Sequence, residues 1–202
     1  RKNPQAVMTA FQQAFASNDD RVGLVIKTNG MVECPEAYQA FKDQALTRHP
    51  RIHLVDRVMD DRELKGLMNQ CDAFVSLHRS EGFGRGLAEA MYLGKPVIAT
   101  AYSGNLDFMN PANSCLVDYT LVPVGENDYP FGQGQYWAEA NIDMAVAYMR
   151  ALVADPALAR EKGARAALDV RRDLGFDAIG QRYRQRFEEL GLIEPLNESD
   201  KG

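Results

Sequence analysis

Three glycines lie between two glutamates, Glu81 and Glu89, in the stretch SLHRSEGFGRGLAEAM, residues 76–91. The stretch begins in the apolar run DAFVSL and continues into a helical pattern, LAEAMYL, so the glycines occupy a turn from a strand into a helix. Glycine lets the backbone approach a ligand closely, and the first N–H groups of a helix have no acceptor within that helix. Such a turn is suited to hold a phosphate group.

The two glutamates lie on either side of this anion site. Glu81 precedes it, and Glu89 lies about one turn inside the helix. Carboxylates accept hydrogen bonds from hydroxyl groups. A diphosphate held between the two glutamates would therefore place a sugar beside one carboxylate and a ribose beside the other.

The same turn has two other interpretations. GFGRGL half-matches the dinucleotide fingerprint G-x-G-x-x-G, which makes an NAD(P)-dependent Rossmann oxidoreductase the second hypothesis. Its last glycine would fall at Leu87, however, and the acidic residue expected about 20 positions later is not clearly placed. In the purely structural alternative, Glu89 is a surface helix residue and the glycines form an ordinary turn.

Apolar, β-branched runs alternate with helical patterns before the C-terminal part of the chain. This alternation with short connections predicts an α/β fold, a Rossmann-like doubly wound parallel sheet covered by helices on both faces. Ligands of such folds bind beyond the C-terminal ends of the strands. The expected strands are residues 21–27, 51–55, 72–77, 96–100 and 114–119, and the expected helices between them are 34–49, 62–70 and 86–94.

The remainder of the chain has a helical pattern from about Ala138, which predicts C-terminal packing helices over residues 138–192. Residues 122–137 are rich in Gly, Pro and aromatics, so we expect an ordered loop able to lie over a pocket. Residues 193–202 are polar and are expected to be a frayed tail. The whole chain, 1–202, is expected to form a single domain.

The N-terminal stretch RKNPQAVMTAFQQAF predicts a helix, with Asn3 as a cap that accepts from backbone N–H groups and Pro4 in the first turn. A parallel sheet would normally place a strand before this helix. Either the fold starts with a helix, or the chain is a piece of a longer protein that was cut just after its first strand.

Composition excludes several classes of protein. The formal net charge of -5 argues against a sequence-independent nucleic-acid binder, which needs a basic face. Cys34, Cys71 and Cys115 are odd in number and far apart, so neither a disulfide framework nor a zinc site is predicted and a reducing cytoplasm fits best. No apolar run approaches the roughly 18 residues that span a bilayer. Peripheral contact of a longer parent protein with a membrane stays open.

Residues 71–108, CDAFVSLHRSEGFGRGLAEAMYLGKPVIATAYSGNLDF, resemble the core of the C-terminal, donor-binding domain of retaining GT-B glycosyltransferases. The family is glycosyltransferase family four, "glycosyl transferases group 1". The Glu-x7-Glu spacing, the intervening GFG, the following EAM and GKPVIA are matched together, and weaker similarity covers most of the chain. The resemblance implies transfer of a hexose, with mannose or glucose favoured, from a nucleotide-diphosphate sugar to a glycan or lipid-linked acceptor.

The same resemblance implies that an N-terminal acceptor domain is missing, so that this chain binds the sugar donor without completing transfer. A third hypothesis keeps the nucleotide-sugar fold as a non-catalytic binding module. Retention in the family is usually described as front-face attack, in which the leaving diphosphate assists deprotonation of the acceptor, so no protein nucleophile is required. Neither a cofactor nor a metal ion is expected, since the sequence has no D-x-D triplet to bind a metal ion.

The resemblance assigns roles to individual residues. Glu81 would contact hydroxyls of the transferred sugar and Lys2, helped by Arg1, would meet the diphosphate, which makes Glu81 and Lys2 the candidate catalytic residues. Glu89 would hold the ribose hydroxyls. The other donor-binding candidates are Gly82, Phe83 and Gly84, with backbone amides beside Glu81, and Gly86 and Leu87, with helix N-terminal amides; further candidates are His78, Arg85, Tyr102, Gly104 and Asn105.

Two positions differ from the usual residues of the family, and His78 has an alternative role. The family often has apolar residues or proline where this chain has Arg85 and Gly86, so the local charge and turn geometry differ. Asp107 stands where a glutamate is common. A lone histidine at a strand end, such as His78, is more often a packing or hydrogen-bonding residue than a general base.

Overall fold

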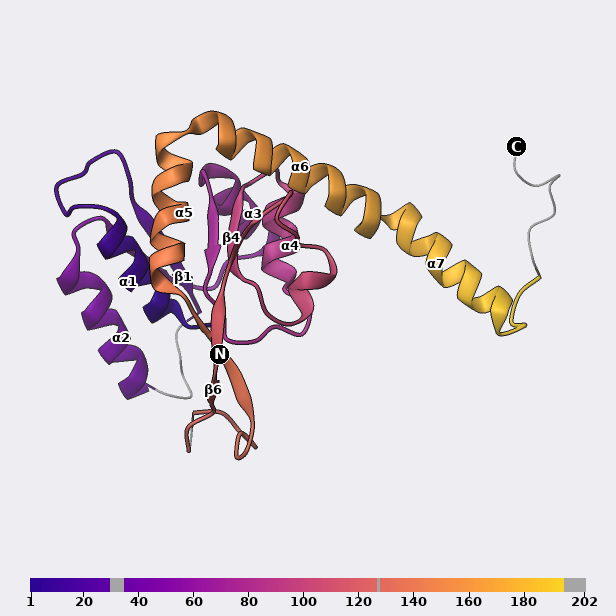
Figure 1. The fold of residues 1–202 in the computed structure, drawn as a ribbon, viewed down its shortest axis with the longest axis horizontal. Coiled ribbons are helices and arrows are strands. Elements are labelled where there is room, and N and C mark those ends of the chain that lie inside the picture. The colour runs from indigo at the N-terminus through magenta and orange to yellow at the C-terminus, as the bar shows by residue number, and fades with distance from the viewer. Residues whose placement is uncertain (30–34, 127, 195–202) are drawn as a thin grey trace.

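The computed structural model describes residues 1–29, 35–126 and 128–194, and in it helices alternate with parallel strands (Figure 1). The α/β fold expected from the sequence is confirmed. The strands are β1 (Leu24–Thr28), β2 (Ile52–Asp56), β3 (Phe74–Ser76), β4 (Val97–Thr100), β5 (Cys115–Val117), β6 (Tyr119–Pro123) and β7 (Tyr136–Ala140). The helices are α1 (Pro4–Ala14), α2 (Pro35–Arg48), α3 (Asp61–Gln70), α4 (Arg85–Tyr92), α5 (Ile142–Ala154), α6 (Pro156–Leu174) and α7 (Phe176–Glu189), with a short 3-10 turn, η1 (Gly104–Asp107).

The five parallel strands form two hydrogen-bonded sheets. β1 pairs with β2, and β4 lies between β3 and β5. Within the described residues β1 and β3 are not paired with each other, so each keeps an edge without a strand partner. Helix α1 contacts both β1 and β3, and one apolar core joins α1 to side chains of both sheets. The parallel layer beneath α1 is therefore interrupted between β1 and β3 and is not one continuous sheet.

Helices cover both faces of the parallel layer. Ile98 of β4 packs in a core with residues of α1 and α5, whereas its neighbours Val97 and Ala99 pack in a second core with residues of α4 and α6. Successive side chains of a strand point to opposite faces. The alternation along β4 therefore gives the doubly wound arrangement predicted from the sequence.

Most of the segment over residues 122–137, expected to be a loop, is the loop that joins β6 and β7 of an antiparallel hairpin, and only its ends, 122–123 and 136–137, belong to the two strands. Residues 138–140, which we expected to open the C-terminal helices, are the end of β7, so those helices run from Ile142 to Glu189 and not over 138–192. Pairing across the hairpin outweighs the helical propensity of this alanine-rich stretch. The frayed tail expected over 193–202 lies, from residue 195 on, outside the described residues, as does Cys34.

Asn3 precedes α1 but does not cap it with its side chain, contrary to expectation. Its backbone is left-handed, with φ 52, a conformation that asparagine tolerates better than most residues. The side chain turns instead toward Glu139 of β7, with Nδ2 3.4 Å from Oε1, and the backbone carbonyl accepts from the N–H of Ala6. The N-terminal segment is thereby tied to the hairpin.

The C-terminal helices differ in how closely they pack. Helix α5 packs on α1, and α6 crosses the end of α4, where Gly163 lies against the carbonyl group of Gly94. Helix α7 contacts α6, has no buried residue and projects from the rest of the molecule (Figure 1). None of the helices in the described chain combines the length and apolar character needed to cross a membrane.

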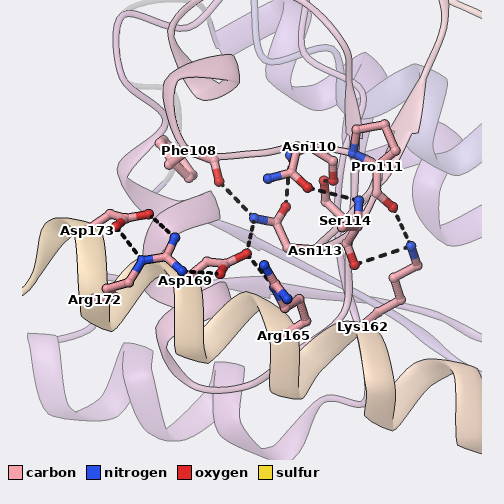
Figure 2. A network of polar contacts seen from close by, with 11 residues as sticks. Phe108, Asn110, Pro111, Asn113, Ser114, Lys162, Arg165, Asp169, Arg172 and Asp173 are labelled. Atoms are coloured by element: carbon pink, nitrogen blue, oxygen red, sulfur yellow. Dashed lines mark hydrogen bonds and ion pairs between the residues drawn. The ribbon is translucent and has the colours of Figure 1, made fainter.

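A buried carboxylate fastens α6 to the loop that follows η1 (Figure 2). Asp169 accepts hydrogen bonds from Asn113 Nδ2 and Arg165 Nε, both at 3.0 Å, and pairs with Arg172 at 3.3 Å. Asn113 also donates to the carbonyl of Phe108 at 3.1 Å. Burial by itself would raise the pKa of Asp169, but the hydrogen bonds from Arg165 and Asn113 outweigh it and hold that pKa below its usual range.

Candidate functional site

Glu81 lies just after β3 and is buried, with 8% of its surface exposed. Lys2 Nζ pairs with one of its carboxylate oxygens, and Arg1 Nη1 lies 3.5 Å from the other. Arg1 Nη1 also donates to the carbonyl of Ser80 at 3.1 Å, and the N–H of Arg79 donates to the carbonyl of Arg1 at 2.9 Å. The structure thus brings together three of the predicted residues, Arg1, Lys2 and Glu81.

The backbone of Glu81 is held by the loop before η1. Its N–H donates to Ser103 Oγ at 2.8 Å, and its carbonyl accepts from the N–H of Gly104 at 3.0 Å. A Cβ at position 104 would overlap the carbonyl of Gly82, so only glycine permits this approach of the two loops. Ser103 has φ 73, an uncommon backbone conformation for a residue with a side chain. The hydrogen bond between Glu81 and Ser103 was not predicted, because it arises from the contact between the two loops and has no local sequence signal.

Gly84 caps the start of α4 in a left-handed conformation, φ 92, and a Cβ there would lie 2.9 Å from Leu87 Cδ1. The N–H of Leu87, which we expected to meet an anion, donates within the chain to the carbonyl of Gly84 at 2.9 Å. The amides of Arg85 and Gly86 precede it in the first turn, where no acceptor from the described chain meets them. Within the described residues, these two N–H groups at the start of α4 are open to an anion.

Glu89 lies one turn inside α4, and Arg85 Nε is 3.5 Å from its Oε1. Arg85 is largely exposed, and exposed ion pairs contribute little free energy, so hydroxyl groups of a ligand can replace this contact. The pKa of Lys65 in α3 is raised by its hydrogen bond with Asp61 and, to a smaller extent, by the charge of Glu89. The charge of Glu89 therefore acts on α3, a helix that contacts α4.

His78 is fully buried, with both ring nitrogens near polar atoms. Nδ1 lies 3.2 Å from Ser76 Oγ, and Nε2 lies 3.1 Å from Asn105 Oδ1 and 3.2 Å from the carbonyl of Tyr102. Asn105 is also fully buried and donates to the carbonyl of Thr100. His78 and Asn105 thus link the end of β3 to the loop before η1, which favours the packing interpretation of His78 over a general base.

The aromatic residues around the site include one that is open to solvent. Phe83 is partly exposed, and its ring packs on that of Phe108 with the centroids 5.1 Å apart. The ring of Tyr102 packs on that of Tyr119 in the hairpin, with the centroids 4.9 Å apart. A Cβ at Gly82 would meet open space, so the backbone beside Phe83 is accessible to a ligand.

Two residues that sequence reasoning missed, Arg79 and Glu139, dock the hairpin on the loop after β3 together with Trp137. Arg79 Nε donates to Glu139 Oε2 at 2.8 Å, and its guanidinium lies 4.7 Å from the centroid of the Trp137 ring. The N–H of Ala138 donates to the carbonyl of Arg79 at 3.0 Å. These pairs join residues far apart in the sequence, so no local motif predicts them.

Within residues 1–29, 35–126 and 128–194, no group of three or more His, Cys, Asp or Glu side chains is placed to hold a metal ion. Metal-independent binding remains a prediction, since an anion site of this kind does not depend on a protein-bound metal. Cys71 and Cys115 are free thiols, and burial raises the pKa of both.

The fold is similar to those of several solved glycosyltransferases. HepE from Anabaena, in complex with UDP and glucose, is 16% identical with a TM-score of 0.70, over 93% of this chain and 45% of that one. Sucrose-phosphate synthase from Thermosynechococcus elongatus is 21% identical with a TM-score of 0.67, over 94% of this chain and 43% of that one. The pneumococcal O-GlcNAc transferase GtfA, in complex with UDP and GlcNAc, is 18% identical with a TM-score of 0.63, over 93% and 33%. At these identities the similarity concerns the fold alone, and the chain spans less than half of each of these proteins.

No match was found among the curated proteins. The sequence profile of the family described as "Glycosyl transferases group 1" matches residues 1–168, a range that begins at Arg1 and ends within α6. It therefore includes every candidate residue of the site and the whole of the core around α1 and α5, whereas the second core also contains Val170, just beyond the matched range. The chain belongs to the glycosyl transferases group 1 family.

Proposed function

We propose that this chain is the C-terminal, donor-binding domain of a retaining GT-B glycosyltransferase that transfers a hexose from a nucleotide-diphosphate sugar. The observation that supports this most directly is the meeting of Lys2 and Arg1 with the buried Glu81 beside the N-terminus of α4. Two cations and a helix N-terminus suit a diphosphate, and a buried carboxylate suits sugar hydroxyls.

The geometry suggests a pose for the sugar donor. The diphosphate lies against the free amides of Arg85 and Gly86, and Lys2, whose side chain is largely exposed, reaches it from Glu81. The transferred sugar lies at Glu81 and the backbone that follows it. The ribose hydroxyls replace Arg85 as the partners of Glu89.

In this pose the protein contributes charge and orientation. Lys2, Arg1 and the α4 amides stabilise the charge that develops on the departing diphosphate. Glu81 is held at both its N–H and its carbonyl, so its carboxylate is oriented before the donor binds. The leaving diphosphate accepts the acceptor proton on the same face of the sugar, which gives retention without a protein nucleophile.

For the substrates, we propose glucose or mannose as the transferred hexose and a glycan or lipid-linked acceptor. HepE and GtfA were both solved with UDP, so UDP is the first nucleotide to test. We place the reaction in the cytoplasm, where the free thiols of Cys71 and Cys115 would persist.

Calorimetric titration with UDP, GDP, UDP-glucose and GDP-mannose tests this function. One nucleotide family should bind, and Glu89→Ala should weaken its binding about tenfold or more, because two hydrogen bonds to a carboxylate are lost. Glu189→Ala in α7, which removes a carboxylate that is paired with an arginine as Glu89 is, is the control and should leave affinity unchanged. Binding of NAD or NADP in place of these nucleotides would instead favour the oxidoreductase hypothesis.

Donor binding should not depend on a divalent metal, because the cationic side chains and helix amides supply the positive charge. Titration with the preferred nucleotide sugar in Mg²⁺ and in EDTA should give the same dissociation constant within about twofold. Loss of binding in EDTA would contradict metal independence while leaving the location of the site intact.

A further inference from the structure

A cavity of about 400 Å³ opens beside Glu81, on the side of the β6–β7 hairpin. This volume is in the range of small-molecule sites. One wall is formed by Arg1 and by the loop after β3 at Ser80 and Gly82. The opposite wall belongs to the hairpin and is rich in aromatic rings, those of Tyr129, Phe131, Tyr136 and Trp137.

Phe131 is the most unusual residue of this wall. Its ring is fully exposed, and its backbone is left-handed, with φ 57, a conformation that is rare for a bulky residue. Both features are unfavourable, and no burial within the described chain offsets them. Tyr136, 60% exposed, also presents its ring to solvent. A ligand that covered these rings would bury their apolar surface and so offset the cost of exposing it.

The aromatic wall has a defined position relative to Glu81. Arg79 lies two residues before Glu81, and its Nη2 is 2.7 Å from Glu139 Oε2. Its guanidinium also packs on Trp137, which lines the cavity. Because the hairpin is docked on the same loop that carries Glu81, the cavity and the candidate sugar site share a border at Gly82 and Arg1.

The lining chemistry matches a neutral pyranose. Aromatic rings stack on the C–H faces of sugars, while a guanidinium, an amide and backbone groups bind their hydroxyls. Arg1 is the one charged side chain among the cavity residues within the described chain, and Gln135 adds an amide. A strongly charged ligand would have only a single charged partner here.

The position of the cavity favours binding of the acceptor over binding of the nucleotide. Glu89, the candidate ribose residue, lies on α4, whereas the described residues that line the cavity come from the N-terminus, the loop after β3 and the hairpin. An acceptor hydroxyl has to approach the transferred sugar next to Glu81, where the cavity opens. We propose that this cavity binds a hexopyranose unit of the acceptor glycan, an inference that rests on the proposed glycosyl transfer.

The single tryptophan of the chain, Trp137, lines the cavity and reports on its occupancy by fluorescence. Methyl α-D-mannopyranoside and methyl α-D-glucopyranoside, titrated to about 50 mM because single sugars bind weakly, should give a saturable change for at least one of them. Saturation-transfer difference NMR on the same glycosides gives a second measure of binding. Saturating UDP should leave the glycoside affinity unchanged.

Two variants at exposed positions test the location. Phe131→Ala and Tyr136→Ala should each weaken glycoside binding about fivefold or more while changing nucleotide affinity less than about twofold. Phe176→Ala, which removes a fully exposed ring at the start of α7, is the matched control and should change neither affinity.

The outcomes separate this proposal from the proposed function. Nucleotide binding without glycoside binding by either method, or glycoside binding unaffected by both cavity variants, would overturn the acceptor subsite alone. Competition of the glycoside with UDP-glucose but not with UDP would assign the cavity to the donor's own sugar and also overturn it. Glycoside binding that the cavity variants weaken, in a chain that binds no nucleotide, would leave a saccharide site and overturn the proposed glycosyl transfer.

Discussion

Asp169 shows how a single buried charge contributes to stability in this chain. It is 4% exposed and accepts from Asn113 and Arg165 (Figure 2). Asp169→Asn should lower the free energy of unfolding in urea by about 2 kcal/mol, because charge-assisted hydrogen bonds are lost at a buried position. Asp173→Asn is the matched control, since Asp173 is exposed and pairs only with Arg172 among the described residues, and should cost less than about 1 kcal/mol.

The pKa of Asp169 also predicts how this effect depends on pH. Hydrogen bonds from Arg165 and Asn113 lower that pKa in the folded chain despite burial, so the unfolded chain binds the proton more readily. The stabilisation is then complete above the unfolded value of about 4 and is lost as pH falls through the folded pKa. The stability difference between the wild type and Asp169→Asn should therefore shrink in acid, and a difference that stayed constant with pH would contradict this account.

Sequence reasoning at the residue scale succeeded for the glycine-rich strand-to-helix turn, which adjacent residues specify. The meeting of Glu81 with Arg1 and with Lys2, 79 residues away, was expected from the resemblance to the family and has no local signal. Sequence reasoning failed where two loops meet. The positive φ of Ser103 depends on its contact with Glu81, and the bond from the Leu87 amide depends on how the first turn of α4 closes.

The crossing of α4 and α6 depends on a small residue. A Cβ at Gly163 would overlap the carbonyl oxygen of Gly94, which is part of the backbone and cannot rotate away. Gly163→Ala should therefore lower the free energy of unfolding by about 2 kcal/mol. Gly180→Ala in α7, where the added methyl meets nothing within 4 Å, should instead raise it by up to about 1 kcal/mol through helix propensity. Equal effects of the two substitutions in urea unfolding would contradict this view of the crossing.

At the scale of elements, the parallel strands and the helices between them could be predicted from the alternation of apolar runs. The hairpin could not. The strand β6 follows β5 so closely that the two resemble one apolar run, and the sequence of β7, YWAEA, has the composition of a helix start. Its strand conformation comes from pairing with β6 and from Arg79, which lies far away in the sequence.

The whole chain covers 45% or less of HepE, sucrose-phosphate synthase and GtfA. This partial coverage supports our proposal that the chain is the donor-binding domain of a larger glycosyltransferase. The 202-residue chain should then bind the nucleotide sugar but transfer no hexose to glycan acceptors above background, measured with a radiolabelled sugar donor. Turnover at the rate of a typical enzyme, about 1 per second or faster, would contradict this.

The interruption between β1 and β3 also affects how the molecule unfolds. Since the two sheets share no hydrogen bonds within the described chain, α1 and its apolar core provide the coupling between them. A weakened α1 would separate the molecule into two cooperative units. The β1–β2 unit would melt first, while the β3–β4–β5 unit, with Glu81 and α4, would keep most of the candidate site folded.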